Sequence, residues 1–453
     1  MKKFLLKQSL VLLSVLFASV TMISCSNDSE LSSVDTRATQ SITVSGVITG
    51  TNNWSGTVYL DGKVFLVNGT LNIAAGTTII GKAKSTAELA SALIITKTGT
   101  INADGTNGTI IFKGETDTKG AWGGLVLLGT GAINQSTAKT IEGITSVQAA
   151  GNDITYGTPA QGMTEAQINA LNNVSSGTLK YVRVENAGAS IADANELNAF
   201  TFGGVGSLTT VEHCQAYHGA DDAFEFFGGA VNCKYLIATA CDDDAFDFDF
   251  GYRGKIQFAV ATIDPSLTYS SDPNGIECDN ENPYDATHTP YTHPVLSNLT
   301  IVGTSTGATN AGVALKSAAN FRRGTRFTLR NSVLYGFPKG IYFTDEPQVQ
   351  LDNSVLTYNV ISSEPSGNEI VSSSNSGTFT NVNNSLVASS ANGLTSPWGG
   401  YSSTTALKPN TAPANTGANF TGLDTTFFIT TTYKGAVATG PAASWTSASW
   451  VRN

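Results

Sequence analysis

Charged residues are scarce in this sequence. Only 13% of its 453 residues are Asp, Glu, Lys or Arg, about half of the quarter that is usual in a globular chain. A long surface helix or a coiled coil needs many Glu, Lys and Arg residues, so both are excluded. Proline is also scarce, with 13 residues, whereas glycine is abundant, with 46. The hydrophobic share of 41% supplies a large core and excludes a wholly disordered chain.

Basic residues are fewer than acidic ones, 25 against 35, which gives a net charge of −10 and an isoelectric point near 4.9. This balance argues against a protein that binds nucleic-acid phosphates. The segment from Asp221 to Glu281 contains 13 acidic and three basic residues, so its surplus of ten equals the net charge of the whole chain. No Gly-x-Ser-x-Gly nucleophile motif and no phosphate-binding loop stands out.

The N-terminus predicts an exported lipoprotein. Lys2, Lys3 and Lys7 precede an apolar stretch, residues 10–20, that is too short to span a bilayer comfortably. Cys25 follows a small residue at the end of this stretch, as in a lipoprotein cleavage site; the alternative is an ordinary signal peptide with a chance cysteine. We therefore expect a signal peptide over residues 1–24, lipidation of Cys25, and a flexible tether over residues 25–41.

The remaining cysteines are Cys214, Cys233, Cys241 and Cys278. An even number permits disulfides in an exported protein. Each of them lies in an apolar or strand-like stretch, so small buried side chains are at least as strongly indicated.

A short pattern recurs through the middle of the chain, in which a small residue is followed by an apolar, a variable and an apolar one. It occurs at Ala199–Phe202, Ala223–Phe226, Ala245–Phe248, Gly275–Cys278, Gly312–Leu315 and Gly340–Phe343. A second strand series occurs at Tyr181–Val184, His213–Ala216, Tyr235–Ala238, Gln257–Val260, Asn298–Ile301, Asn331–Leu334 and Asn353–Leu356.

Several steps in both series are 22 residues, which is one coil of a parallel β-helix. A propeller blade needs a longer period, and leucine-rich repeats would show their own spacing. The sequence therefore predicts an all-β solenoid, a single parallel β-helix over residues 42–453 with a C-terminal capping segment. Loops at 261–274 and 280–296 lengthen the central coils, and one short helix is expected at Thr164–Leu171.

Several segments resemble a group of exported Bacteroidota proteins with right-handed parallel β-helices. The resemblance rests on Gly120–Leu125, Leu179–Glu185, Asp221–Gly229, Asp242–Asp249 and the tail from Phe427 through Trp445 to Trp450. It implies a right-handed coil and says little about activity. The polar, acidic run Ser26–Glu30 also resembles the export signal of their surface lipoproteins. It implies anchorage in the outer membrane through Cys25, on the cell surface.

Stacked coils convert the repeat into columns of side chains. The predicted inward column contains Phe224, Phe226, Phe246, Phe248, Ile276 and Cys278. The first outward column contains Thr201, Glu225, Asp247, Glu277, Ala314 and Tyr342, and the next contains Phe227, Asp249, Asp279, Lys316 and Thr344. A turn column contains Asn198, Asp222, Asp244 and Asn274, which we expect to form a ladder that satisfies backbone N–H groups.

Carboxylates at coil spacing repel one another, by a few kcal/mol per pair at an effective dielectric near 20. Three outcomes relieve this repulsion: a bound cation, protonation of some carboxyls, or neutralisation by Arg253 and Lys255. Oxygen ligands favour Ca²⁺ over Zn²⁺, so Ca²⁺ is the candidate if a cation binds. Its candidate ligands are Asp221, Asp222, Asp243, Asp244, Asp247 and Asp249. A solvated acidic face without a ligand is the simpler alternative.

The favoured function is binding of a carbohydrate or another extracellular ligand by a surface lipoprotein. The candidate ligand-binding residues are Glu225, Asp247, Asp249, Glu277, Asp279, Tyr217, Tyr252, Tyr284 and Tyr291. A polysaccharide lyase or glycosidase is the less favoured alternative. Its candidate catalytic residues are Glu225, Asp247 and Glu277, with Arg253 or Lys255 as the base. A third alternative is an adhesin or structural protein without a small-ligand site. His288 and His293 are more simply read as ordinary loop residues.

Overall fold

The computed structural model describes residues 41–192, 195–344, 353–372, 380–398, 404–440 and 444–453. The expected signal peptide, Cys25 and the tether up to residue 40 lie outside the described residues. Within the described part of the chain, no helix is long and apolar enough to span a membrane.

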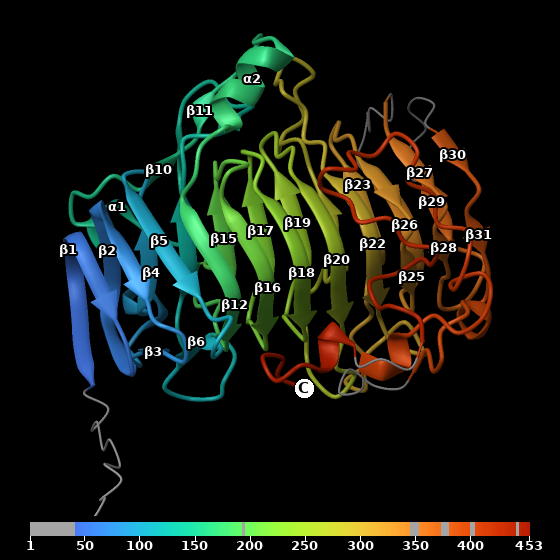
Figure 1. Cartoon of the computed structure of the whole chain (residues 1–453), viewed down its shortest axis with the longest axis horizontal. Coiled ribbons are helices and arrows are strands. Elements are labelled where there is room, and N and C mark those ends of the chain that lie inside the picture. Colours follow the sequence, from blue (N-terminus) through green and yellow to red (C-terminus); the bar gives the residue numbers. More distant parts are fainter. Residues whose placement is uncertain (1–40, 193–194, 345–352, 373–379, 399–403, 441–443) are drawn as a thin grey trace, which may run out of the picture. The chain divides into compact units, whose positions relative to one another are not determined.

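The chain from residue 41 onwards forms a right-handed parallel β-helix, as predicted (Figure 1). Each coil has three sides, which we call faces A, B and C in chain order. Strands β1 (Ile42–Trp54) and β2 (Thr57–Ile73) run across all three faces. The strands that turn from face A to face B are β12 (Gly177–Glu185), β16 (Thr210–Tyr217), β18 (Asn232–Thr239), β20 (Lys255–Thr262) and β22 (Val295–Val302).

Shorter strands complete the faces. Face A also contains β5 (Gly99–Asp104), β24 (Thr328–Arg330), β27 (Val355–Thr357) and β30 (Thr380–Val382). Face B also contains β3 (Thr78–Gly81), β6 (Ile110–Gly114), β25 (Val333–Tyr335), β28 (Val360–Ile361) and β31 (Ser385–Leu386). Face C consists of β4 (Ala92–Ile95), β7 (Gly124–Leu128), β15 (Phe200–Gly203), β17 (Phe224–Phe227), β19 (Phe246–Asp249), β21 (Glu277–Cys278), β23 (Ser317–Arg322), β26 (Lys339–Thr344) and β29 (Ile370–Ser372).

Residues 129–176 leave the coil stack between β7 and β12. They contain β8 (Ala132–Ile133), β9 (Lys139–Thr140), α1 (Ser146–Ala149), β10 (Thr155–Tyr156), β11 (Thr158–Pro159) and α2 (Glu165–Asn172). Thr164 caps α2 as predicted, because its hydroxyl accepts the Gln167 N–H. Ile141, Ile144 and Tyr156 of this insertion pack on outward apolar residues of face C, which covers the N-terminal half of that face.

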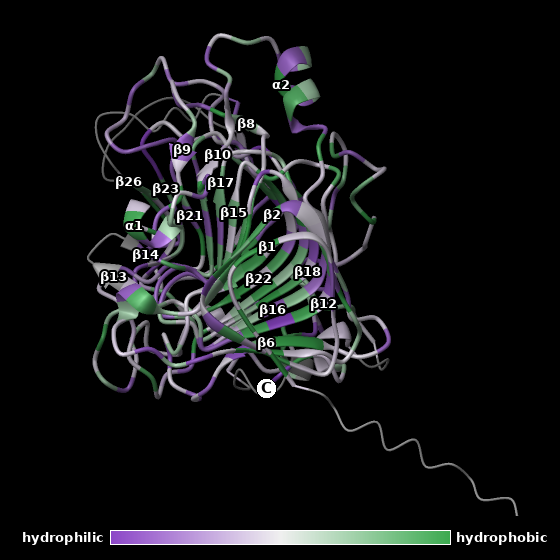
Figure 2. Ribbon diagram, turned by 90° about the vertical axis from the view of Figure 1, so that its left-hand side faces the viewer, coloured by the Kyte–Doolittle hydropathy of each residue, from purple (hydrophilic) through white to green (hydrophobic). Residues whose placement is uncertain are grey.

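The remaining short elements lie in loops. They are β13 (Ser190–Ala192), β14 (Asn195–Glu196) and the 3-10 turns Ala87–Leu89, Ser389–Ala391, Thr404–Leu407 and Trp445–Ser447. In Figure 2 the stacked strands are mainly green, and much of the purple lies in the surrounding loops.

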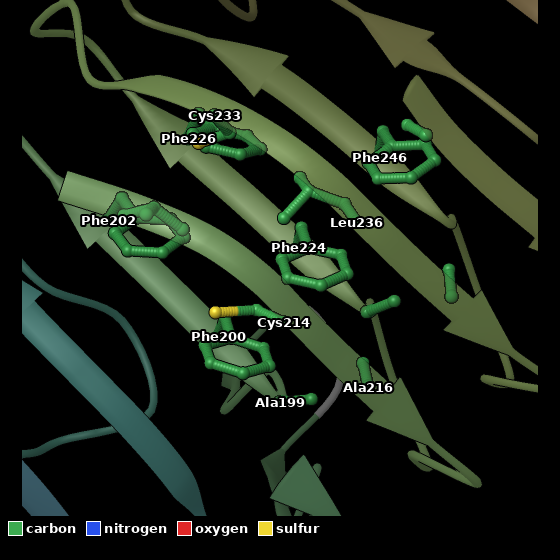
Figure 3. Close-up of a cluster of buried hydrophobic side chains, with 14 of the residues drawn as sticks. Ala199, Phe200, Phe202, Cys214, Ala216, Phe224, Phe226, Cys233, Leu236 and Phe246 are labelled. Carbon is green, nitrogen blue, oxygen red and sulfur yellow. The ribbon is translucent and has the colours of Figure 1, made fainter. Parts of the chain in front are cut away.

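The interior is built from stacked identical side chains, as the repeat predicts. The rings of Phe200, Phe224 and Phe246 stack at centroid distances of 4.8 and 5.6 Å (Figure 3). A second column of Phe202, Phe226 and Phe248 stacks at 5.1 and 5.2 Å. The four cysteines Cys214, Cys233, Cys241 and Cys278 are buried and free. Of the two alternatives, they are small buried side chains and not disulfide partners.

The repeat assignment is wrong at three places. Gly312–Leu315 lies in a loop, where Ala314 bridges Ala308, and the strand that follows β21 on face C is Ser317–Arg322. Asn320 and Arg322 therefore take the column positions assigned to Ala314 and Lys316, and residues 303–316 form an additional loop. In the second series, the residue that stacks on Tyr235 in the next coil is Phe258 and not Gln257. Val355 was assigned to the same series, but it belongs to face A because it pairs with Thr328.

The C-terminal segment runs along the side of the solenoid instead of capping its end (Figure 1). We call its described residues 404–440 and 444–453 the strap. The Gln257 side chain donates to the Ile429 carbonyl (2.7 Å) and accepts its N–H (2.8 Å). Gln215, two coils earlier, bonds the backbone of Arg452 in the same way, at 2.7 and 2.8 Å. The strap therefore joins coils that are not neighbours.

Candidate functional site

One column of outward-facing side chains runs the length of face C, and its members change from apolar to acidic along the solenoid. In register order it contains Phe65, Ile94, Val126, Thr201, Glu225, Asp247, Glu277, Asn320 and Tyr342. The apolar members lie under the insertion, whereas the three carboxylates occupy consecutive coils of β17, β19 and β21. The predicted acidic column is therefore present, with Asn320 in place of Ala314.

The turn before each of these strands carries the predicted ladder. The Asn198 side-chain oxygen accepts the Asp222 N–H (3.1 Å), and Asp222 Oδ1 accepts the Asp244 N–H (2.8 Å). Asp244 Oδ1 accepts the Asn274 N–H (2.7 Å), and Asn274 Oδ1 accepts the Ser317 hydroxyl (2.6 Å). Each ladder carboxylate uses one oxygen in this way, so its second oxygen is left for another partner.

Five carboxyl groups of the ladder and column, together with Asp221 and Asp243 in the adjoining turns, form three overlapping triads. They are Asp221, Asp222 and Asp243; Asp222, Glu225 and Asp247; and Asp244, Asp247 and Glu277. Within each triad the oxygens all lie within 4.8 Å of one another. We call these seven residues the acidic cluster. Five of the six predicted metal ligands belong to it, whereas Asp249 instead accepts the Phe250 N–H at 2.6 Å.

The acidic cluster is largely removed from solvent. Asp222, Glu225, Asp244 and Glu277 are only 4–8% exposed. Burial raises the pKa of Asp222, Asp244 and Asp247 well above its usual range, and neighbouring carboxylates raise it further. Asp247 Oδ1 is buried and has no hydrogen-bond partner among the described residues. Protons or a cation must therefore compensate the cluster at neutral pH.

An eighth carboxyl group, Glu142, comes from the insertion and was not predicted. It forms a hydrogen bond with Glu225, which requires that one of the two be protonated. Burial is the main cause that raises the pKa of Glu142 to about 6. Glu142 lies 83 positions before Glu225, outside the repeat, so only the fold brings it to the cluster. Its one sequence signal is an acid inside the apolar stretch Ile141–Ile144.

Two arginines that sequence reasoning missed neutralise the C-terminal end of the acidic face. Arg322 Nε lies 2.9 Å from Asp279 Oδ2, and Arg322 also pairs with Glu277. Arg323 Nη1 lies 2.5 Å from the same Asp279 oxygen. Burial opposes the charged form of Arg322, but Glu277 and Asp279 outweigh it and raise the pKa of Arg322 above its usual value.

Arg253 and Lys255, the two bases expected to neutralise the carboxylates, pair elsewhere, and so does Lys316 of the predicted outward column. Arg253 pairs with Glu165 of α2 (2.7 Å), Lys255 with Asp424 of the strap (2.6 Å) and Lys316 with Asp272 (3.5 Å). Arg253 lies in the turn before β20, Lys255 begins β20 and Lys316 precedes β23, so none of the three lies within a face C strand beside the carboxylates. Among the residues that the structure describes, Glu277 is the only member of the acidic cluster that has a basic ion-pair partner.

The predicted ligand-contacting aromatics do not surround the cluster. Tyr252 is fully buried in the core, where its ring stacks on Phe248 and its hydroxyl donates to the Val231 carbonyl at 2.8 Å, so it cannot face a ligand. Tyr217 is 6% exposed and packs beside Arg452 of the strap. Neither tyrosine therefore contacts the acidic cluster, because Tyr252 packs in the core and Tyr217 packs against the strap.

The aromatic residues of the loop after β21 do not contact the acidic cluster. Tyr284 packs against Gly324, and Tyr291 lies under the Arg326 guanidinium, 4.1 Å from the ring centroid. His288 pairs with Glu281, and His293 Nε2 lies 3.3 Å from the Thr328 hydroxyl. The loop therefore builds a separate surface beside α2 rather than a cover on the acidic cluster.

Comparison with known protein families gives one match. A family model described as a pectate-lyase-like beta helix domain matches residues 46–406. No curated protein and no solved structure matches the chain.

Proposed function

The chain belongs to the family of pectate-lyase-like β-helix domains, and from this premise we propose that its acidic cluster binds Ca²⁺ and, through the ion, a carbohydrate. The proposed setting is the cell surface, with a lipid anchor on Cys25 in the outer membrane. The family places the fold among carbohydrate-related proteins, and the cluster supplies the chemistry for binding.

The ladder carries this proposal. Asn198 and Asn274 form its outer rungs with neutral amides, so the ladder does not need charge. Its two inner rungs are nevertheless Asp222 and Asp244, and these belong to the carboxylate triads. An asparagine at either position would accept the same backbone hydrogen bond without a charge. Burying a charged aspartate there instead costs folding free energy. A cation ligand explains why the charge is kept there.

The donor set suits calcium. The acidic cluster offers only carboxylate oxygens, without cysteine or histidine, and hard oxygen donors favour Ca²⁺ over zinc. Ca²⁺ takes six to eight oxygen ligands and tolerates irregular geometry. When bound, the ion would neutralise the buried carboxylates and offer remaining coordination positions to sugar hydroxyl or carboxylate oxygens.

A glycosidase is the second candidate, because burial raises the pKa of Glu225 well above its usual range and the neighbouring Glu142 raises it further. A carboxyl group that stays protonated near neutral pH suits a general acid. A lyase is less well supported, since Arg322 beside the carboxylates is held in its charged form and is a poor base.

Calcium titration of a double variant tests the proposal. We expect wild type to bind Ca²⁺ and Asp222→Asn with Asp244→Asn to lose binding by at least tenfold, while each asparagine keeps its ladder bond. The control is Asp285→Asn, a loop residue outside the cluster, which should bind as wild type does. Equal calcium affinity in the double variant and wild type would contradict the metal site.

A glycan array with and without a chelator tests the carbohydrate part. Retention of a glycan only when calcium is present supports the proposed order of binding. Release of reducing sugar by wild type but not by Glu225→Gln would replace binding with glycosidase activity.

The anchor has its own test in cells that express the chain. We expect wild type to incorporate labelled palmitate and to be cleaved by protease added to intact cells. Cys25→Ala should lose the label. A labelled protein that is protected from the protease would place the chain on the periplasmic side instead.

A further inference from the structure

A cationic cavity lies apart from the acidic cluster, between α2, the turn after β19 and the loop after β21. Its volume is about 250 Å³, and its polar lining includes Arg253, Arg326, Tyr291, His293 and Thr289. This is below the roughly 300–1,000 Å³ of sites for drug-sized ligands, so the cavity fits one small group. A positively charged cavity is unexpected in a chain with a net charge of −10.

Arg326 is the central group. Its guanidinium lies over the Tyr291 ring, with Cζ 4.1 Å from the ring centroid, which is a cation–π contact. Arg326 Nε is buried and has no hydrogen-bond partner among the described residues. None of the ion pairs in the described part of the chain involves Arg326. Arg326 lines the cavity, and no carboxylate among the described ion pairs compensates its charge, so an anion bound in the cavity would be stabilised.

Arg253 supplies the second guanidinium. It pairs with Glu165 at 2.7 Å, and the Glu165 side chain is 67% exposed. An exposed ion pair is weak, so Glu165 can give way to an incoming anion at little cost. With Glu165 counted, the cavity keeps one surplus positive charge.

The pKa of His293 also indicates a positive potential in the cavity. Burial, followed by the charges of Arg253 and Arg326, lowers the pKa of His293 to about 4. The imidazole is therefore neutral at neutral pH, and its Nε2 lies 3.3 Å from the Thr328 hydroxyl. A bound anion would offset the two guanidinium charges and raise this pKa.

We propose that this cavity binds a single oxyanion group, the carboxylate or sulfate ester of an acidic sugar. Two guanidinium groups match the oxygens of either group through charge-assisted hydrogen bonds. The site rests on the proposed function only for the source of the anion, a glycan. It uses none of the residues of the acidic cluster.

Titration with small probes distinguishes the sources. The probes are glucuronate, glucose 6-sulfate, glucose and inorganic sulfate, at low ionic strength, followed by calorimetry and by the His293 imidazole signal. We expect at least one acidic sugar to bind and glucose not to bind, and whichever acidic sugar binds identifies the oxyanion. Bound sugar should raise the pKa of His293. Binding of inorganic sulfate without either acidic sugar would show an adventitious ion only and overturn the proposal.

Three variants test the residues. Arg326→Gln should weaken acidic-sugar binding at least tenfold. Glu165→Gln should strengthen it about threefold or more, because Arg253 loses its competing carboxylate; a purely structural ion pair predicts no gain. Arg330→Gln is the matched control, since Arg330 instead bonds Thr357 at 2.8 Å outside the cavity. Unchanged affinity in both Arg326→Gln and Glu165→Gln overturns the site.

Calcium titration of the same variants separates this site from the acidic cluster. Arg326→Gln should bind Ca²⁺ as wild type does. If wild type binds acidic sugars but not Ca²⁺, the proposed function fails and the oxyanion site stands. If Arg326→Gln does not fold, which its melting curve would show, Arg253→Gln takes its place with the same expected loss.

Discussion

Replacing Asp247 by asparagine should stabilise the calcium-free protein at neutral pH. Asp247 belongs to two triads, so its carboxylate faces Asp222, Glu225, Asp244 and Glu277 with oxygens within 4.8 Å. At an effective dielectric of about 20, two unit charges at this separation repel by roughly 3.5 kcal/mol. Asp247 and its four neighbours therefore cannot all be ionised. Protonation of Asp247 removes these repulsions, so the free-energy cost cannot exceed the cost of protonating it.

That limit can be calculated from the pH. Keeping a carboxyl group protonated at pH 7, when its ordinary pKa is 3.8, costs about 4 kcal/mol. Because the pKa of Asp247 is raised in the folded state, the folded state holds a proton that the unfolded chain releases. Folding is therefore favoured as the pH falls towards 4 and loses this contribution as the pH rises. Asparagine carries no such cost, so its benefit should reach about 4 kcal/mol at pH 7 and almost vanish at pH 4.

Scanning calorimetry in chelator measures the effect. For about 400 residues the unfolding entropy is near 0.8 kcal/mol/K, so the melting temperature should rise by up to about 5 °C at pH 7. Adding Ca²⁺ should raise the melting temperature of wild type and leave that of Asp247→Asn unchanged. Asp285→Asn is the control, because hydrogen bonds from Thr287 lower the pKa of exposed Asp285 and predict no gain. A variant that is destabilised equally at pH 7 and pH 4 would refute the reasoning.

Three further changes test other parts of the molecule. Phe224→Ala removes the middle ring of a buried stack and should cost about 3–5 kcal/mol of unfolding free energy, measured by urea denaturation; a loss below about 1 kcal/mol would contradict the packing. Gln215→Ala removes two hydrogen bonds to the Arg452 backbone and should speed amide exchange in residues 444–453, but not in β17. Gly324→Ala places a methyl group against the Tyr284 ring at a φ of +78°, so it should lower the melting temperature by several degrees, whereas Gly312→Ala, with a similar φ and open space, should have a smaller effect.

The sequence was sufficient for the fold where bulky side chains mark the repeat. Phe224 and Phe246 lie 22 residues apart, and this spacing predicted both the inward stack and the outward carboxylates. It failed after β21, where Gly312–Leu315 and Ala318–Phe321 both match the pattern six residues apart. Val313 is more hydrophobic than Ala319, its counterpart in the second match, and this favoured the wrong segment. The correct strand places small Ala319 inward, a residue with little hydrophobic signal.

The same shift explains what was missed at the site. With the correct register, Arg322 occupies the place given to Lys316 and lies beside Asp279. Glu142 had no register to follow, since it comes from an insertion without a repeat. Tyr252 was a candidate ligand contact because it follows the acidic strand in sequence, but its ring packs in the core beside Phe248. The repeat pattern does not predict the positions of Arg322, Glu142 and Tyr252, because tertiary packing determines them.

The strap changes how the solenoid should unfold. In a stack of coils each coil contacts only its neighbours, so local opening at one end need not affect the other. Here the hydrogen bond between Gln215 and Arg452 joins positions 237 residues apart, and Asn331 bonds the strap at Asn419. Trp445 and Trp450 also pack edge-on against the outer rings of Tyr235 and His213. Opening the coil at Asn331 therefore loosens the cover on the coil at His213, so the central coils should exchange their amides as one cooperative unit rather than one coil at a time.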